Sequence, residues 1–174
     1  STQEFTFATW IYYSGSSTGN FQLLDSVSLS GSGGAGGTQG CELYVDDDGR
    51  LRFYLNHYEV SDDSTGGSAL WTYENFETKY ANRWVHLAIT YNSASSPNSA
   101  SVYFNAVSGV WSGYACSAAG GCPSNYSTIQ RPMPINELFF LDSCRTHLPS
   151  AKATRLWYGG ISQAIWYNKE LDAG

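Results

Sequence analysis

The segment FTFATWIYY at residues 5–13 is the feature of the sequence that most limits the fold. Aromatic and β-branched residues occupy both alternating sets of positions, and a period of two is typical of a β-strand. Because both sets are mostly apolar, the sequence predicts a strand that is buried on both faces or nearly so. Further runs with strand character follow at residues 22–29, 41–45, 51–55, 84–91, 101–107, 138–141 and 161–167.

Gly-rich and Ser-rich connections separate these runs, and no segment has the apolar period of a helix of useful length. Strands at this spacing predict an all-β protein built as a two-sheet antiparallel β-sandwich of the jelly-roll type. A length of 174 residues fits one domain over 1–174. We expect long irregular insertions at roughly residues 56–82 and 105–135, where specificity determinants would lie.

Charge and hydropathy exclude two classes of partner. The formal net charge is -6, with only 9 Lys and Arg residues, so no basic patch offsets repulsion from a phosphate backbone. The sequence also contains no apolar span long enough to cross a bilayer. We therefore expect neither nucleic-acid binding nor membrane insertion.

The four cysteines indicate disulfides rather than a metal site, because they contain no CxxC pair and no histidine at zinc spacing. Cys116 and Cys122 enclose a short flexible segment, so of three connectivities we favour Cys116 with Cys122 and Cys41 with Cys144. Disulfides indicate a secreted or cell-surface protein, and the sequon at Asn125 predicts glycosylation there. The chain starts without an initiator Met or a signal peptide, so we expect a mature form or a fragment of a larger extracellular protein.

Three consecutive aspartates, Asp46–Asp48, precede Gly49 between two alternating runs. Asp-Gly is a strong hairpin signal, because Gly accepts positive φ and Asp tolerates it. An EF-hand would need alternating ligands and a glutamate at its twelfth position, which here is His57. A retaining glycosidase would place its carboxylates on one face of a strand rather than in a turn. The sequence predicts a hairpin turn, with metal binding as the minor alternative.

Gly31, Gly33 and Gly36 formally match the GxGxxG pattern of dinucleotide-binding folds. That interpretation requires a helix directly afterwards, whereas CELYV with strand periodicity follows. We expect a mobile hairpin loop in this segment.

Six segments carry a resemblance to a known family: FTFATWIYY, ELYVDDDGRLRFYL, NRWVHLAITYN, SVYFNAV, ELFFLDS and GGISQAIWYNKELDAG. In order and spacing they resemble the concanavalin A-like jelly-roll domains of the laminin G type, in the pentraxin-related branch. The sequence departs from that pattern at Asn105-Ala106, where the family has Asp-Gly, and at Ser162-Gln163, where it has an acidic pair.

The resemblance implies a non-catalytic interaction or structural module of an adhesion, matrix, surface or filament protein. It also implies that five residues belong to the framework: Trp10, Trp84, His86, Tyr91 and Trp166. We expect His86 to be a hydrogen-bonded core residue rather than a ligand.

The opening strand that normally precedes FTxxxW in this family is missing from the sequence. Its absence would leave unpaired N–H and C=O groups at a sheet edge. We expect either that the natural protein extends beyond both ends, or that a protein partner or neighbouring copy completes the sheet by β-strand addition.

A lectin is the second function class, because related jelly rolls bind sugars. Four aromatic residues outside the best strand motifs could stack on a sugar ring: Trp71, Trp111, Tyr114 and Trp157. The competing interpretation is that they pack the long loops onto the sandwich, since buried aromatics are common.

Calcium is the cofactor that the resemblance implies, held at the rim of the sandwich by Asp25 and Asp142. Two carboxylates supply only part of the six or more oxygens that calcium takes. We therefore expect little change in melting temperature when a chelator is added.

A glycoside hydrolase or lyase on the same fold is the third class. The ExDxxE run of such hydrolases is absent, and the nearest acidic pair, Glu137 and Asp142, has an odd spacing that places the side chains on opposite faces. The histidines His57, His86 and His147 show no HxH or HExxH spacing, and no GxSxG surrounds a serine. We predict that the protein is not an enzyme.

Overall fold

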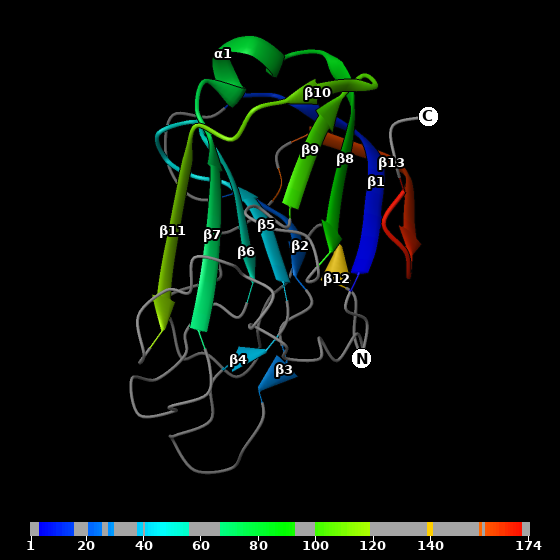
Figure 1. The fold of residues 1–174 in the computed structure, drawn as a ribbon. Coiled ribbons are helices and arrows are strands. Elements are labelled where there is room, and N and C mark those ends of the chain that lie inside the picture. Colours follow the sequence, from blue (N-terminus) through cyan, green and yellow to red (C-terminus); the bar gives the residue numbers. More distant parts are fainter. Residues whose placement is uncertain are drawn as a thin grey trace.

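A computed structural model describes residues 4–15, 21–25, 28–29, 38–39, 41–55, 67–92, 100–118, 139–140, 157 and 159–171. Two antiparallel sheets make up the sandwich within these residues (Figure 1). The five-stranded sheet has the order β10-β9-β8-β1-β13, formed by Val107–Gly109, Ala100–Phe104, Trp84–Asn92, Glu4–Tyr13 and Gly159–Tyr167. The six-stranded sheet has the order β11-β7-β6-β5-β2-β12, formed by Gly113–Ala118, Gly67–Tyr73, Leu51–Leu55, Cys41–Val45, Phe21–Asp25 and Phe139–Phe140. The predicted all-β sandwich is confirmed.

Two small elements lie at opposite ends of the sandwich (Figure 1). The single short helix of the described residues, α1, spans Phe76–Tyr80 at one end. At the other end β3 (Ser28–Leu29) pairs with β4 (Thr38–Gln39). This pairing confirms a hairpin in the Gly-rich region, although residues 30–37 lie outside the described part of the chain.

The core lies between the sheets and follows the period of two. On β1 the buried hydrophobic side chains are Phe5, Phe7, Ile11 and Tyr13, and on β8 they are Val85, Leu87, Ile89 and Tyr91. Both sets face Leu43, Val45, Phe53 and Trp71 of the other sheet, within one hydrophobic cluster. Trp166 of β13 stacks on Phe5 with ring centroids 4.4 Å apart. Each fully buried side chain of this kind contributes roughly 1.5–3 kcal/mol.

The described parts of the two predicted irregular insertions contain regular elements, while residues 56–66 and 119–135 lie outside the described residues. The first contains β7 and α1, and the second contains β10 and β11. The strand β7 was missed because GSALWTY begins with Gly and Ser, which have low β-propensity. Pairing with β6 and β11 on its two sides stabilises it, and this tertiary context is invisible in the local sequence.

The run SVYFNAV is a hairpin rather than one strand. Both residues of its two-residue turn have positive φ, 52° at Asn105 and 64° at Ala106, as a type I′ turn requires. The turn is held against β8, where the Asn105 backbone N–H donates to the His86 carbonyl at 2.8 Å.

None of the helices in the described residues is long and apolar enough to span a bilayer. At one edge of the five-stranded sheet, within the described residues, lies β13. Completion of that sheet by a further strand stays a prediction.

Candidate functional site

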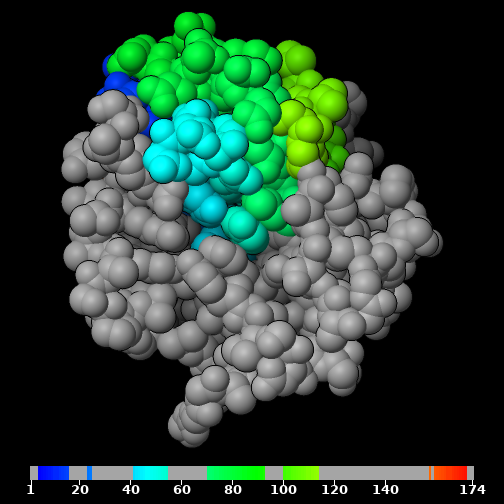
Figure 2. All heavy atoms as spheres, turned by 90° about the vertical axis from the view of Figure 1, so that its left-hand side faces the viewer, coloured from blue at the N-terminus to red at the C-terminus, as the bar shows by residue number. Residues whose placement is uncertain are grey.

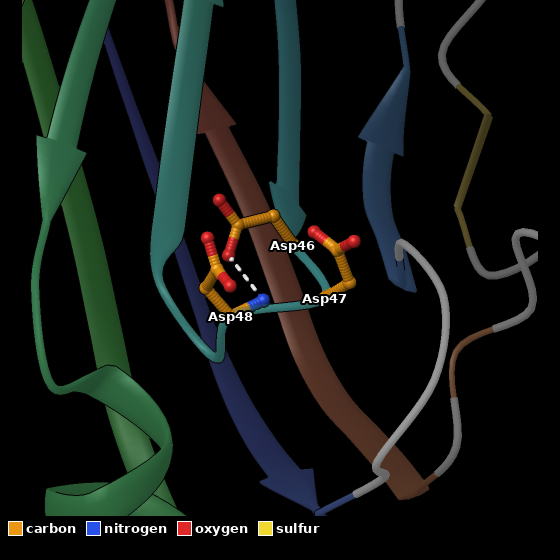
Figure 3. Close-up of side chains that lie close together, drawn as sticks. All are labelled: Asp46, Asp47 and Asp48. Atoms are coloured by element: carbon orange, nitrogen blue, oxygen red, sulfur yellow. Dashed lines mark hydrogen bonds between the residues drawn. The ribbon is translucent and has the colours of Figure 1, made fainter.

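The DDDG segment forms the tight turn between β5 and β6. The Gly49 N–H donates to the Asp46 carbonyl at 2.9 Å, the Asp46 N–H donates to the Arg50 carbonyl at 3.0 Å, and Gly49 has a φ of 73°. A three-residue loop with a left-handed glycine is a common hairpin geometry. The hairpin prediction is confirmed (Figure 3).

The carboxylate of Asp46 is the hydrogen-bonding centre of this turn. Its Oδ1 accepts from the backbone N–H groups of Asp48 at 3.1 Å and Arg50 at 3.0 Å. Its Oδ2 accepts from the Nε atoms of Arg50 at 2.9 Å and Arg52 at 2.7 Å. Burial alone would raise the pKa of Asp46, but the hydrogen bonds from Arg50 and Arg52 outweigh it and lower the pKa.

The same turn brings carboxylate oxygens of Asp46, Asp47 and Asp48 within 4.8 Å of one another, which raises the question of a cation. In Figure 3 the Asp46 carboxylate lies toward Asp48, while the Asp47 carboxylate stands on the other side of Asp46. Arg50 also pairs with Asp48, so two of the three carboxylates already have guanidinium partners. Because calcium takes six or more oxygens and would have to displace both arginines, these residues do not fit a calcium site.

Figure 2 shows where this turn lies on the surface: the cyan atoms of residues 41–55 adjoin the green atoms of residues 67–92. The backbone contact behind this arrangement is a 2.9 Å hydrogen bond from the Glu77 N–H of α1 to the Gly49 carbonyl. A Cβ atom at Gly49 would lie 2.6 Å from Glu77 Oε2. The turn therefore attaches the β5–β6 hairpin to α1 through this hydrogen bond and the close packing of Gly49 against Glu77.

Two of the four aromatic residues predicted to stack on sugar do not lie at the surface. Trp71 is 0% exposed and Trp157 is 7% exposed, and both belong to the core cluster. Trp111 is half-buried against the same cluster, and its Nε1–H donates to the Ala100 carbonyl at 2.9 Å. Tyr114 lies on β11, but its side chain is outside what the structure describes. The prediction for Trp71 and Trp157 was wrong because sheet packing encloses them.

The remaining predicted site residues are only partly covered. Asp25 ends β2, opposite Glu42 and Phe139 in the register. The other predicted residues lie outside the described residues: Asp142, Asn125, Cys122, Cys144 and Glu137.

Two of the four cysteines lie on described strands. Cys41 is buried on β5 and Cys116 lies on β11. The register Cys41–Leu55–Ala69–Cys116 puts these two cysteines in one row, three strand spacings apart. That is roughly 14 Å, too far for a disulfide between them.

The outer face of the five-stranded sheet holds the exposed aromatic residues instead. Trp10 is 38% exposed and Trp84 is 51% exposed, although both were expected in the framework. The prediction that the first strand is buried on both faces was therefore wrong for the part of its outer face that carries Trp10. We call this surface the aromatic face; it is formed by Trp10, Tyr12, Trp84, His86, Tyr103, Ile165 and Tyr167.

Cross-strand pairs position these rings. Trp10 lies opposite His86 in the register, and their rings meet edge to face with centroids 5.3 Å apart. Tyr12 lies opposite Trp84, with centroids 5.9 Å apart. His86 is half-buried beside Trp10 on the outer face, rather than within the core that separates the sheets.

A hollow of about 200 Å³ opens in the middle of the aromatic face. It exists because two of the smallest side chains, Ala8 and Ala88, are register partners at its centre. Within the described residues, its lining contains no Asp, Glu, Lys or Arg. We call it the alanine hollow; it is lined by Thr6, Ala8, His86, Ala88, Thr90, Tyr103, Ala106, Tyr167 and Leu171.

The segment after β13 closes one side of the hollow. The Thr6 hydroxyl donates to the Lys169 carbonyl at 2.9 Å and accepts from the Leu171 N–H at 2.9 Å. The Asn92 side-chain amide donates to Glu170 Oε2 at 2.9 Å. These three bonds fix Leu171 at the wall of the hollow.

The sequence did carry a signal for this site. Trp10 lies two positions after Ala8 and Trp84 lies four positions before Ala88, so in each strand the tryptophan and the alanine share a face. The two-residue period of a strand does not say which of its two faces is open to solvent.

Comparisons with known proteins give a family and a fold. A family model described as the concanavalin A-like lectin/glucanases superfamily matches residues 1–109. No curated protein matches the sequence. Among solved structures, a candidate carbohydrate binding protein from Bacteroides ovatus is similar, with a TM-score of 0.55, 14% identity, and coverage of 99% of this chain and 39% of that one.

Two toxin domains are also similar in fold. The binding domain of botulinum neurotoxin serotype D has a TM-score of 0.52 at 13% identity, covering 99% of this chain and 35% of that one. The binding domain of serotype C1 has a TM-score of 0.50 at 16% identity, covering 98% of this chain and 34% of that one. The chain therefore spans well under half the length of these three structures.

Proposed function

Because the chain belongs to the concanavalin A-like lectin/glucanases superfamily, we propose that it is a non-catalytic module that binds carbohydrate on its aromatic face. The observation that carries this proposal is the pair of exposed indoles, Trp10 and Trp84, on the same face as a hollow whose described lining has no carboxylate, ammonium or guanidinium group. Flat aromatic rings present the apolar surface on which the C–H face of a sugar packs, and the Tyr and His side chains offer hydrogen-bond donors and acceptors.

The geometry of the carboxylates supports a role in binding rather than catalysis. Glu42 and Asp46 are the two acidic residues at alternate positions of β5 and the adjoining turn, and they are 0% and 6% exposed. Four residue steps along the chain put them roughly 13 Å apart, whereas glycosidases place their carboxylates about 5–9.5 Å apart. Asp46 is also held by two arginines. The Bacteroides ovatus structure, by its description a candidate carbohydrate binding protein, agrees with this function.

We place the module outside the cell, as one domain of a larger protein. The four cysteines and the Asn125 sequon support secretion. A chain that spans about two fifths of a structural relative suits a role as one unit among several. Calcium has no part in this proposal, because binding would rest on the rings and hydroxyls of the aromatic face.

A glycan array probed with the recombinant domain tests the proposal. We expect binding to neutral glycans and a loss of about tenfold in affinity for Trp84→Ala, which corresponds to roughly 1.4 kcal/mol. Val110→Ala is the matched control, since Val110 is 81% exposed and lies between β10 and β11 rather than on the aromatic face. An array without signal, from a domain that melts cooperatively, would count against carbohydrate binding.

A protein partner or a second copy of the chain is the other candidate occupant of this surface. Ile165, Tyr167 and Leu171 are 44%, 42% and 38% exposed on the same side, and clustered exposed apolar groups are typical of interfaces. Sedimentation velocity would detect self-association through this face. Ile165→Arg should then shift the protein toward the monomer, whereas carbohydrate binding alone predicts a monomer in both cases.

A further inference from the structure

The alanine hollow has an apolar floor. Ala8 and Ala88 face each other across β1 and β8, so only two methyl groups stand between the sheet and the hollow. On both sides along the strands the side chains are larger, with Thr6 and Thr90 in one direction and Trp10 and His86 in the other. The floor is thus a local depression set by side-chain size at one cross-strand pair.

The walls of the hollow add apolar surface with a few polar groups. Tyr103 of β9 lies beside Ala88 of β8, and Tyr167 and Leu171 lie on the opposite side of the hollow. Tyr103, Tyr167 and His86 carry groups that can donate or accept hydrogen bonds. A plain sugar ring pushed into this hollow would set hydroxyl groups against alanine methyls, and unpartnered buried hydroxyls are unfavourable.

One polar atom in the lining has no partner of its own. Thr90 is 3% exposed, and its Oγ1 has no hydrogen-bond partner among the described residues. That oxygen is itself closed off from solvent, so the hydrogen bonds to an entering amide group would come from the more accessible polar side chains of the wall, Tyr103, Tyr167 and His86. The residues of the lining that the structure describes also include no Asp, Glu, Lys or Arg, so a charged substituent would be desolvated there without an ionic partner from them.

From these features we propose that the alanine hollow is a subsite for the acetamido group of a neutral N-acetylated sugar. The methyl group packs on Ala8 and Ala88, the amide bonds to the polar side chains of the wall, and the sugar ring stacks on the indole of Trp10, the next residue of this face after Ala8 on β1. This inference rests on the proposed function and adds the class of sugar that the site selects.

Chitotriose and cellotriose form a matched pair of probes, because they share the same β-1,4-linked backbone and differ in the acetamido groups. Calorimetric titration should give at least tenfold tighter binding for chitotriose. Equal affinity for both overturns the subsite and leaves the carbohydrate-binding function standing. Binding of neither, together with a silent glycan array, overturns both.

A second pair of sugars tests whether the hollow selects the acetamido group or only a methyl group. L-Fucose and L-galactose differ only in a methyl against a hydroxymethyl group. A preference for fucose without a preference for chitotriose contradicts the acetamido assignment, and a preference for chitotriose alone supports it.

Filling the hollow tests its location. Ala88→Leu places a larger side chain on the floor, and it should remove the preference for chitotriose while weak cellotriose binding through Trp84 persists. Ala8→Val is the second variant in case the first unfolds, and Val110→Ala is the control. Unchanged selectivity in a folded Ala88→Leu or Ala8→Val protein overturns the proposal.

Discussion

Gly160 of β13 lies directly against the indole ring of Trp84, two strands away on β8. A Cβ atom at position 160 would lie 2.8 Å from Trp84 Cη2 and 3.1 Å from Cζ2. The ring therefore extends from β8 toward β13 past Tyr12, which pairs with both residues. The missing side chain at Gly160 is what allows this indole to reach across the sheet while 51% of it stays exposed.

Gly160→Ala should displace the Trp84 ring and weaken glycan binding several-fold, with a stability change within about 1 kcal/mol because the side chain rather than the backbone moves. The measurement is the dissociation constant, together with the fluorescence of the tryptophans. Gly113→Ala on the other sheet is the control, since a Cβ there meets only ordinary contacts at 3.5 Å. Unchanged affinity and fluorescence would show that Trp84 is not held in this way.

Removing the Asp46 carboxylate should destabilise the β5–β6 hairpin. Asp46→Asn retains an acceptor for the backbone N–H groups but loses the arginine pairs, and we expect a loss of about 1 kcal/mol because both guanidinium groups are partly solvated. Asp46→Ala loses the backbone bonds as well, for a total of about 2–3 kcal/mol. Urea unfolding measures both, and exposed Asp47→Asn is the control.

The stabilisation from Asp46 should also depend on pH. Its pKa in the folded protein lies below the ordinary value of 3.8, so its contribution is present above about pH 4 and is lost as the pH falls through the folded pKa. Stability of the native protein should therefore fall more steeply below pH 4 than that of Asp46→Asn. Parallel acid curves for the two proteins would contradict this account.

Ala106→Gly should stabilise the protein. Ala106 has a φ of 64°, a left-handed conformation that is unfavourable for residues with a Cβ atom and accessible to Gly. We expect a gain of about 1 kcal/mol, or roughly 2–4 °C in melting temperature for a chain of this size. Ala88→Gly, in regular strand backbone, should instead destabilise by about 0.5–1 kcal/mol. If Ala106→Gly and Ala88→Gly changed the free energy of unfolding in the same direction, the result would argue against the type I′ turn.

Gly159→Ala should be strongly destabilising. Gly159 has a φ of 153°, and a Cβ there would lie 1.7 Å from the Tyr12 carbonyl oxygen, so the backbone of β1 or β13 would have to move. We expect a loss of at least about 3 kcal/mol in urea unfolding. Gly113→Ala again serves as the control. A Gly159→Ala protein of native stability would mean that the β1–β13 pairing differs from the one described.

Peptide mapping under non-reducing conditions should find no link between Cys41 and Cys116, which lie three strand spacings apart in the six-stranded sheet. We predict Cys41 joined to Cys144 and Cys116 joined to Cys122. The second link closes a short loop and should add less stability than the first, whose reduction should lower the melting temperature markedly. A Cys41–Cys122 peptide would reject this pairing while leaving the register intact.

Much of the fold could be predicted from local patterns. The strands β1, β5, β6 and β8 were found where alternation was strong, and the Asp46–Gly49 turn was found because only a few residue types accept its backbone. The strand β7 was not found, because its Gly and Ser residues carry little strand propensity and its neighbours β6 and β11 hold it in the sheet.

The candidate site could not be predicted in the same way. Both alternating sets of β1 are rich in aromatic residues, so the sequence by itself determined two faces and their membership but not which one would meet the other sheet. Packing of the two sheets decided that Phe5 and Phe7 are enclosed and Trp10 is exposed, and that Trp71 of β7 is buried. The alanine hollow likewise needed the register of β1 with β8, because Ala8 and Ala88 are eighty residues apart in sequence and only cross-strand hydrogen bonding places two small side chains side by side.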